Sequence, residues 1–147
     1  MKNYSLFCYD FLFNDHLGKC SNEAKLLYIK LHFYANNGFV PNVKGILDSL
    51  GYDKSILQEL INAEELLTIP GREEVFITSY YVHNRGVKHT SWLKTPYAQY
   101  WKNKLWTKKN GIATLKPYTK EEDEKTTSAE QHEENKSWEE MLNDIHA

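Results

Sequence analysis

The spacing of apolar and polar residues predicts three helices in the first half of the chain. Residues 24–35 are apolar on nearly every side, which is typical of a buried helix, and Ser21 is a suitable N-cap for it. In residues 43–50 the apolar side chains recur at i, i+3, i+4 and i+7, and Gly51 ends this helix. A third helix is expected over residues 53–64. Two short helices joined by a glycine-containing turn are typical of a helix-turn-helix, although any small helical hairpin has the same pattern.

Short β-rich runs extend this pattern to that of a winged helix. Residues 39–40 form a brief strand before the second helix, and residues 66–69 and 74–82 form a hairpin around the turn at residues 70–73. A β-hairpin directly after a helix-turn-helix is a wing. We therefore expect an α+β, mainly helical fold, namely a winged helix-turn-helix followed by a C-terminal basic helix and a flexible acidic tail.

The second half of the chain predicts one further helix and a tail. Thr95 caps this helix, Pro96 occupies its first position, and the Asn-Gly pair at 110–111 ends it. We expect a winged-helix domain with a basic aromatic extension over residues 1–116. Residues 117–147 are rich in Glu, Lys and Thr, as disordered segments are. Their last part, 138–145, predicts a short amphipathic helix with the apolar stripe Trp138, Met141, Leu142 and Ile145.

Charge is strongly segregated along the chain. The formal net charge is −2, yet residues 75–120 contain nine lysines and arginines and no acidic residue. Residues 121–147 contain two basic and ten acidic residues. Three of the four tryptophans lie in the basic segment, and cations interleaved with aromatic rings suit a nucleic-acid partner. The alternative is that the rings pack in the core and the lysines are merely solvated. We favour phosphate contact.

Two sets of residues are candidates for DNA contact. The outward face of the third helix offers side chains that read base edges or reach phosphates, namely Lys54, Ser55, Gln58 and Asn62. The wing and the basic segment offer phosphate ligands, namely Arg72, Arg85, Lys88, Lys94, Lys102, Lys104, Lys108 and Lys109. Glu59, Glu64 and Glu65 weigh against a strong electrostatic grip at the third helix.

Other classes of protein find little support in the sequence. There is no apolar run long enough to span a membrane, and we expect no signal peptide. Two cysteines without a Cys-x-x-Cys pair are typical of reduced thiols in a cytoplasmic protein. No nucleotide-binding glycine loop or nucleophile elbow is present. We expect a protein that is not an enzyme and that uses no cofactor and no metal.

Four segments resemble the N-terminal winged-helix domain of phage and prophage replisome organisers of Gram-positive bacteria, which are DnaD-like replication initiation proteins. They are residues 21–28, residues 35–42, the strand 75–84 that finishes in His-Asn, and the Thr-Pro-Tyr of residues 95–97. The resemblance implies DNA binding at an origin or replication fork, oligomerisation through the winged domain, and a helper role in helicase loading. The family usually has a longer C-terminal domain than the short acidic tail found here.

These observations predict a cytoplasmic, phage-type DNA-binding protein that takes part in replication initiation. We expect double-stranded rather than single-stranded DNA as partner, a homodimer paired through the aromatic residues 4–13, and a possible helicase-loading or other replication protein. The rivals are a winged-helix transcriptional regulator and an adaptor that binds protein instead of DNA. The tail has three interpretations: a solubility tail, a brake folded back on the basic segment, or a partner-binding segment, which we rank first.

Overall fold

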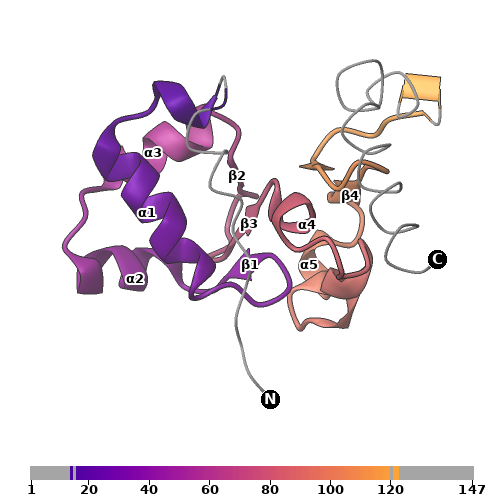
Figure 1. Cartoon of the computed structure of the whole chain (residues 1–147). Coiled ribbons are helices and arrows are strands. Elements are labelled where there is room, and N and C mark those ends of the chain that lie inside the picture. Colours follow the sequence, from indigo (N-terminus) through magenta and orange to yellow (C-terminus); the bar gives the residue numbers. More distant parts are fainter. Residues whose placement is uncertain (1–13, 15, 120, 123–147) are drawn as a thin grey trace.

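The computed structural model describes residues 14, 16–119 and 121–122, and it has an α+β fold (Figure 1). Three longer helices come first: α1 (Asn22–His32), α2 (Val43–Leu50) and α3 (Lys54–Asn62). The short helical elements are η2 (Leu17–Lys19), α4 (Tyr80–His83), η3 (Ser91–Lys94) and α5 (Ala98–Trp101). The strands are β1 (Phe39–Val40), β2 (Leu66–Leu67), β3 (Val75–Ile77), β4 (Trp106–Thr107) and β5 (Ala113–Thr114). The aromatic segment 4–13 lies outside the described residues.

Helix α1 begins where its cap predicts and ends three residues early. The Ser21 side chain accepts a hydrogen bond from the Ala24 N–H at 3.1 Å, which satisfies a donor in the first turn. The expectation that the helix is buried on nearly every side is wrong for one side, because Leu26 and Phe33 are 47% and 79% exposed. The chain then turns through Gly38, whose φ of +95° and close approach to the Phe76 ring leave no room for a Cβ.

The central sheet is antiparallel and has the order β1-β3-β2. Phe39 pairs with Phe76 across β1 and β3, and Leu67 pairs with Phe76 across β2 and β3. The predicted strand 74–82 is too long, since β3 ends at Ile77 and the chain becomes helical at Tyr80. A strand would send Tyr80 and Tyr81 to opposite faces, whereas the helical turn buries both. Packing therefore overrides the β preference of these residues.

The predicted C-terminal basic helix is mostly absent. Helix α5 covers only Ala98–Trp101, and the following residues form an antiparallel hairpin in which Trp106 pairs with Thr114. The Asn-Gly pair at 110–111 is the hairpin turn and not a helix end. Gly111 has a φ of +93°, which suits a hairpin turn. It also lies against the backbone of Tyr81, and a Cβ added at Gly111 would be 3.2 Å from the carbonyl carbon of Tyr81.

Aromatic rings from the basic segment complete the core around Phe39. Its ring centroid lies 5.2 Å from that of Trp101, 5.1 Å from that of Tyr97 and 6.3 Å from that of Trp92. Trp92 and Trp101 are buried. These rings therefore hold the second half of the fold onto the sheet, so core packing is the correct interpretation for them. In Figure 1 the sheet separates α1, α2 and α3 on one side from α4, α5 and the hairpin on the other.

The last described residues are attached to the hairpin. The Tyr118 hydroxyl donates a hydrogen bond to the Thr107 carbonyl at 2.5 Å, two residues beyond the expected domain end at 116. Thr119 and Glu122 then form a reciprocal capping box: the Glu122 N–H donates to the Thr119 hydroxyl, and the Thr119 N–H donates to the Glu122 carboxylate. These two hydrogen bonds join Thr119 and Glu122 near the start of the acidic tail. The predicted helix 138–145 lies outside the described residues.

Candidate nucleic-acid interface

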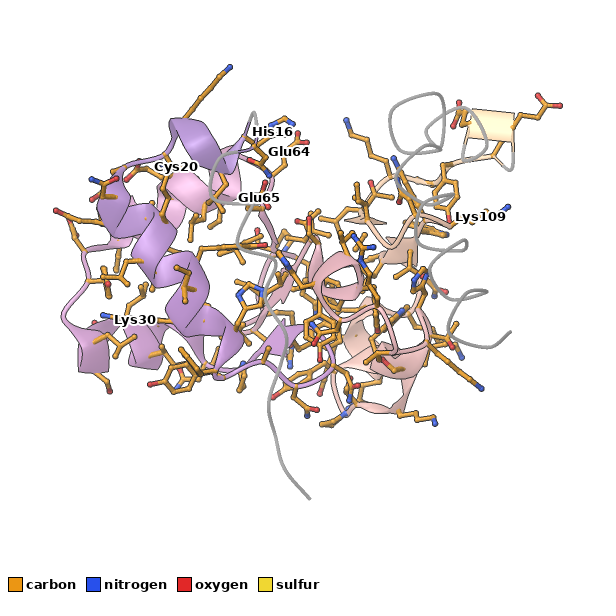
Figure 2. All side chains as sticks on the ribbon, viewed as in Figure 1. His16, Cys20, Lys30, Glu64, Glu65 and Lys109 are labelled. Carbon is orange, nitrogen blue, oxygen red and sulfur yellow. The ribbon has the colours of Figure 1, made fainter. Side chains whose placement is uncertain are left out.

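The elements after the sheet form a region with basic residues and no acidic ones, which we call the basic lobe (residues 80–118). Its sequence contains eight lysines and arginines and no aspartate or glutamate. Seven of the eight are exposed and Lys108 is half-buried. Figure 2 shows Lys109 in this lobe, well away from Lys30 on α1. The eight basic residues of the lobe extend from the loop after α4 to the end of the hairpin and are Arg85, Lys88, Lys94, Lys102, Lys104, Lys108, Lys109 and Lys116. The charge segregation of the sequence is therefore also a segregation in space.

Helix α3 presents the predicted polar face. Lys54, Ser55, Gln58 and Asn62 are all exposed, and the spacing of Lys54, Gln58 and Asn62 by four residues aligns them along one side of the helix. Two of these side chains bond to each other, because the Gln58 amide donates to the Asn62 side-chain oxygen at 2.8 Å. The Ser55 hydroxyl donates to the Asp53 carboxylate at 3.0 Å. Contact with a base edge would have to replace these bonds.

Glu59 has a structural role on the same helix. Its carboxylate accepts a hydrogen bond from the Ser21 N–H at 2.9 Å and another from the Ser21 hydroxyl at 2.7 Å, at the N-terminus of α1. These two bonds lower the pKa of Glu59, so it stays ionised. Its charge is thereby directed to the positive end of α1. Because the carboxylate of Glu59 is bound to Ser21, it should repel DNA at α3 less strongly than the sequence suggests.

Glu65 lies in the interior, beyond the end of α3. Its side chain is 4% exposed, and burial raises the pKa of its carboxyl, while a hydrogen bond from Asn14 opposes that rise. Among the described residues its Oε2 atom has no hydrogen-bond partner. Figure 2 shows Glu65 close to His16 and Glu64. Of the three glutamates near the third helix, Glu64 is exposed, Glu59 is half-exposed and Glu65 is buried.

Arg72, in the turn between β2 and β3, contacts two other side chains of the protein. Its guanidinium lies 2.7 Å from the carboxylate of the buried Glu74 and 3.6 Å from the ring centroid of Tyr100, which is part of α5. This stacked ion pair ties the turn to the basic lobe. Sequence reasoning selected Arg72 as a phosphate ligand, and these contacts give its charge a different partner.

A groove joins the end of α3 to the basic lobe. Ile61 and Glu64 line one side, and Lys108 and Lys116 of the hairpin line the other, around a volume of about 340 Å³. The groove brings two lysines of the basic lobe beside the helix that carries the predicted base-reading face. Helical spacing predicted the polar face of α3, and charge segregation predicted the basic segment. The groove lies beside Ile61 of α3, and Lys54, Ser55, Gln58 and Asn62 are not among its lining residues.

Lys19 is a candidate that sequence reasoning missed. It lines an open hollow of about 430 Å³ together with His16 and Asn62, so a cation lies beside the last residue of the predicted base-reading face. The signal available in the sequence was weak, because Lys19 precedes α1 by only three residues and is separated from α3 by more than thirty.

Comparisons with protein-family models, with curated proteins and with solved structures find no match to this chain. Across the described part of the chain, no helix combines the length and apolar character needed to cross a membrane. In the same residues no cluster of three or more His, Cys, Asp or Glu side chains is suited to holding a metal ion. The geometry described above therefore carries the functional argument.

Proposed function

We propose that this protein binds double-stranded DNA as a winged-helix protein. The observation that carries the proposal is the basic lobe, whose eight cations are exposed or half-exposed. Two of them, Lys108 and Lys116, line a groove together with Ile61 of α3, the helix whose polar face is exposed. Such a lobe neutralises phosphates and releases their counterions, while Lys54, Gln58 and Asn62 on α3 suit base edges in a major groove. Ser55 and Lys19 extend this surface.

The order of the elements supports the winged-helix assignment. A helix, a short strand, two helices and a hairpin follow one another as α1, β1, α2, α3 and β2–β3. The proposed wing is the β2–β3 turn, and the Arg72 pair with Glu74 and Tyr100 fixes its position against the basic lobe. Wing contacts to phosphate would then come chiefly from the lobe beside it.

A role in phage-type replication initiation is the finer proposal. It is supported by the sequence resemblance to replisome organisers, with a helicase-loading or other replication protein as a further partner. A transcriptional regulator of the same fold is the rival. Footprinting across the native genome distinguishes the two, because the first protects repeats within a replication region and the second protects a promoter.

The test of DNA binding is the salt dependence of affinity. Fluorescence anisotropy of labelled duplex is measured at several salt concentrations for the wild type and for a variant in which Lys102, Lys104, Lys108 and Lys109 are alanine. If all four contact phosphates, the slope of log affinity against log salt falls by about 3 to 4. Lys25→Ala/Lys44→Ala, on α1 and α2, is the control and should change the slope less. Equal slopes for the four-lysine variant and the wild type would remove the basic lobe from the interface.

A protein-interaction adaptor is the second candidate, and one observation favours it. Helix α1 and the turn after it expose Leu26, Phe33 and Tyr34, with 47%, 79% and 44% of each side chain exposed. Exposed apolar side chains grouped in this way commonly mark a protein contact, including one between the two copies of a dimer. Phe33→Ser tests this surface. Loss of self-association without loss of monomer DNA binding would make it a dimer contact, and DNA binding absent in all forms would favour the adaptor.

A further inference from the structure

The groove between α3 and the hairpin has the character of a binding site for an apolar, acidic peptide. Its floor and walls include four half-buried apolar side chains, Ile61, Leu67, Ile112 and Leu115. They come from α3, from β2 and from the hairpin, so the groove exists only in the folded protein. A volume of about 340 Å³ is within the range of cavities that accept a large side chain or a small ligand.

The rim of the groove is mixed in charge but mainly basic. Lys108 and Lys116 line it, and Glu64 is the acidic residue among its lining residues. Lys109 adjoins Lys108 in the hairpin turn. A peptide with an apolar stripe and acidic flanks would therefore satisfy both the walls and most of the rim.

The chain contains such a peptide. The stripe Trp138, Met141, Leu142 and Ile145 is spaced as one face of a helix, and Glu139, Glu140 and Asp144 lie between its members. It carries its own negative charge within a tail of ten acidic and two basic residues. The groove has apolar walls and lysines, and the segment has an apolar stripe and carboxylates, so the two are complementary in both respects.

The length of the connecting chain permits contact. The described chain reaches Glu122, and 15 residues separate it from Trp138. Fully extended, that tether spans about 50 Å, while a domain of this size has a radius of gyration of only about 13 Å. The point of departure is also favourable, because Tyr118 is bonded to Thr107 on β4, in the hairpin that forms one side of the groove.

We infer that residues 138–145 dock in this groove of their own chain and shield the hairpin lysines from nucleic acid. The shielding rests on the proposed function, whereas the docking does not. A flexible tether gives the segment an effective concentration on the order of 1 mM at the groove. An intrinsic dissociation constant of about 0.1 mM then suffices for the segment to occupy the groove in roughly 90% of the molecules. DNA that needs the open form then binds about tenfold more weakly than it would without the segment.

The test uses the full chain in three forms: the wild type, Trp138→Ala/Leu142→Ala, and the matched control Asn135→Ala/Asn143→Ala, which leaves the apolar stripe intact. The first measurement is the backbone amide chemical shifts of Leu67, Ile112 and Leu115. Docking predicts that these shifts differ between the stripe variant and the wild type and agree between the control and the wild type. If all three forms give the same groove shifts, docking is refuted whatever the protein binds. Groove shifts that change with protein concentration would place the segment in a second copy and refute docking within one chain.

The second measurement is duplex DNA affinity for the same three forms. Shielding predicts about tenfold tighter binding by the stripe variant and no change for the control. Groove shifts that respond to the stripe variant, together with no DNA binding by any form, would preserve docking and refute the proposed function. DNA binding of equal strength in all three forms would refute shielding.

Discussion

Two buried histidines are expected to make the folded protein sensitive to mild acid. His32 on α1 and His83 on α4 are both buried, with ring centroids 5.0 Å apart. Tyr28 contacts both, because its hydroxyl lies 2.8 Å from His83 Nε2 and its carbonyl accepts a hydrogen bond from His32 Nδ1 at 2.8 Å. Burial lowers the pKa of His32 to about 4, and burial together with repulsion from His32 and Arg85 lowers the pKa of His83 to about 3.

The direction of the effect follows from which state binds the proton. An unfolded histidine titrates near pH 6.5, so above that pH neither state is protonated at these sites and their stability contribution is constant. As the pH falls below 6.5, the unfolded chain takes up protons that the folded protein excludes until about pH 4 at His32 and about pH 3 at His83. Each site then destabilises the fold by about 1.4 kcal/mol per pH unit. Together they remove roughly 3 to 4 kcal/mol between pH 7 and pH 5.

Urea unfolding followed by tryptophan fluorescence at pH 7, 6 and 5 measures this loss. His83→Gln keeps a polar partner for Tyr28 and cannot titrate, so the loss of unfolding free energy between pH 7 and pH 5 should fall to about half the wild-type value. His16→Gln, at an exposed position, should leave the loss unchanged. A wild-type unfolding free energy that is the same at pH 7 and pH 5 would refute the reasoning, as would a His83→Gln variant with the full wild-type loss.

Three further variants test individual contacts. Glu59→Ala should lower the free energy of unfolding by about 1 kcal/mol, because Ser21 at the start of α1 loses its acceptor. This difference from wild type should shrink in acid as Glu59 becomes protonated, and urea titration at pH 7 and pH 3.5 measures the difference at each pH. Gly38→Ala should cost about 2 to 4 kcal/mol, since a Cβ would overlap the Phe76 ring at positive φ, and thermal unfolding would show it. Arg72→Ala should lower the urea midpoint by leaving Glu74 buried without its cation, yet should leave the salt slope of DNA binding unchanged.

The sequence predicts the first half of the fold well because its signals are local. The Ser21 cap is made as expected, Asn42 accepts a hydrogen bond from the Gly45 N–H at 3.3 Å, and Gly51 ends α2 with a φ of 75°. Each of these signals acts within a few residues. The polar face of α3 follows in the same way from helical spacing, and its four members are exposed.

The second half of the fold was predicted less well because its signals are ambiguous or distant. An Asn-Gly pair serves a helix end and a hairpin turn equally well, and the pairing of Trp106 with Thr114 decides for the hairpin. The partners of candidate site residues lie far away in sequence. Glu59 contacts Ser21 across 38 residues, and Arg72 stacks on Tyr100, so no local pattern could assign either side chain.

These distant contacts change the weight of the adaptor alternative. In the sequence, three glutamates near the third helix favour the adaptor, because they would repel DNA. In the fold, Glu59 is hydrogen-bonded at the N-terminus of α1, and Glu65 is buried with a raised pKa, which leaves Glu64 as the exposed carboxylate of the three. Glu64 lies at the groove opposite Lys108 and Lys116, where cations outnumber it. The electrostatic case against DNA at α3 is therefore weaker than the composition of the helix suggests, and the exposed apolar face of α1 becomes the adaptor's principal support.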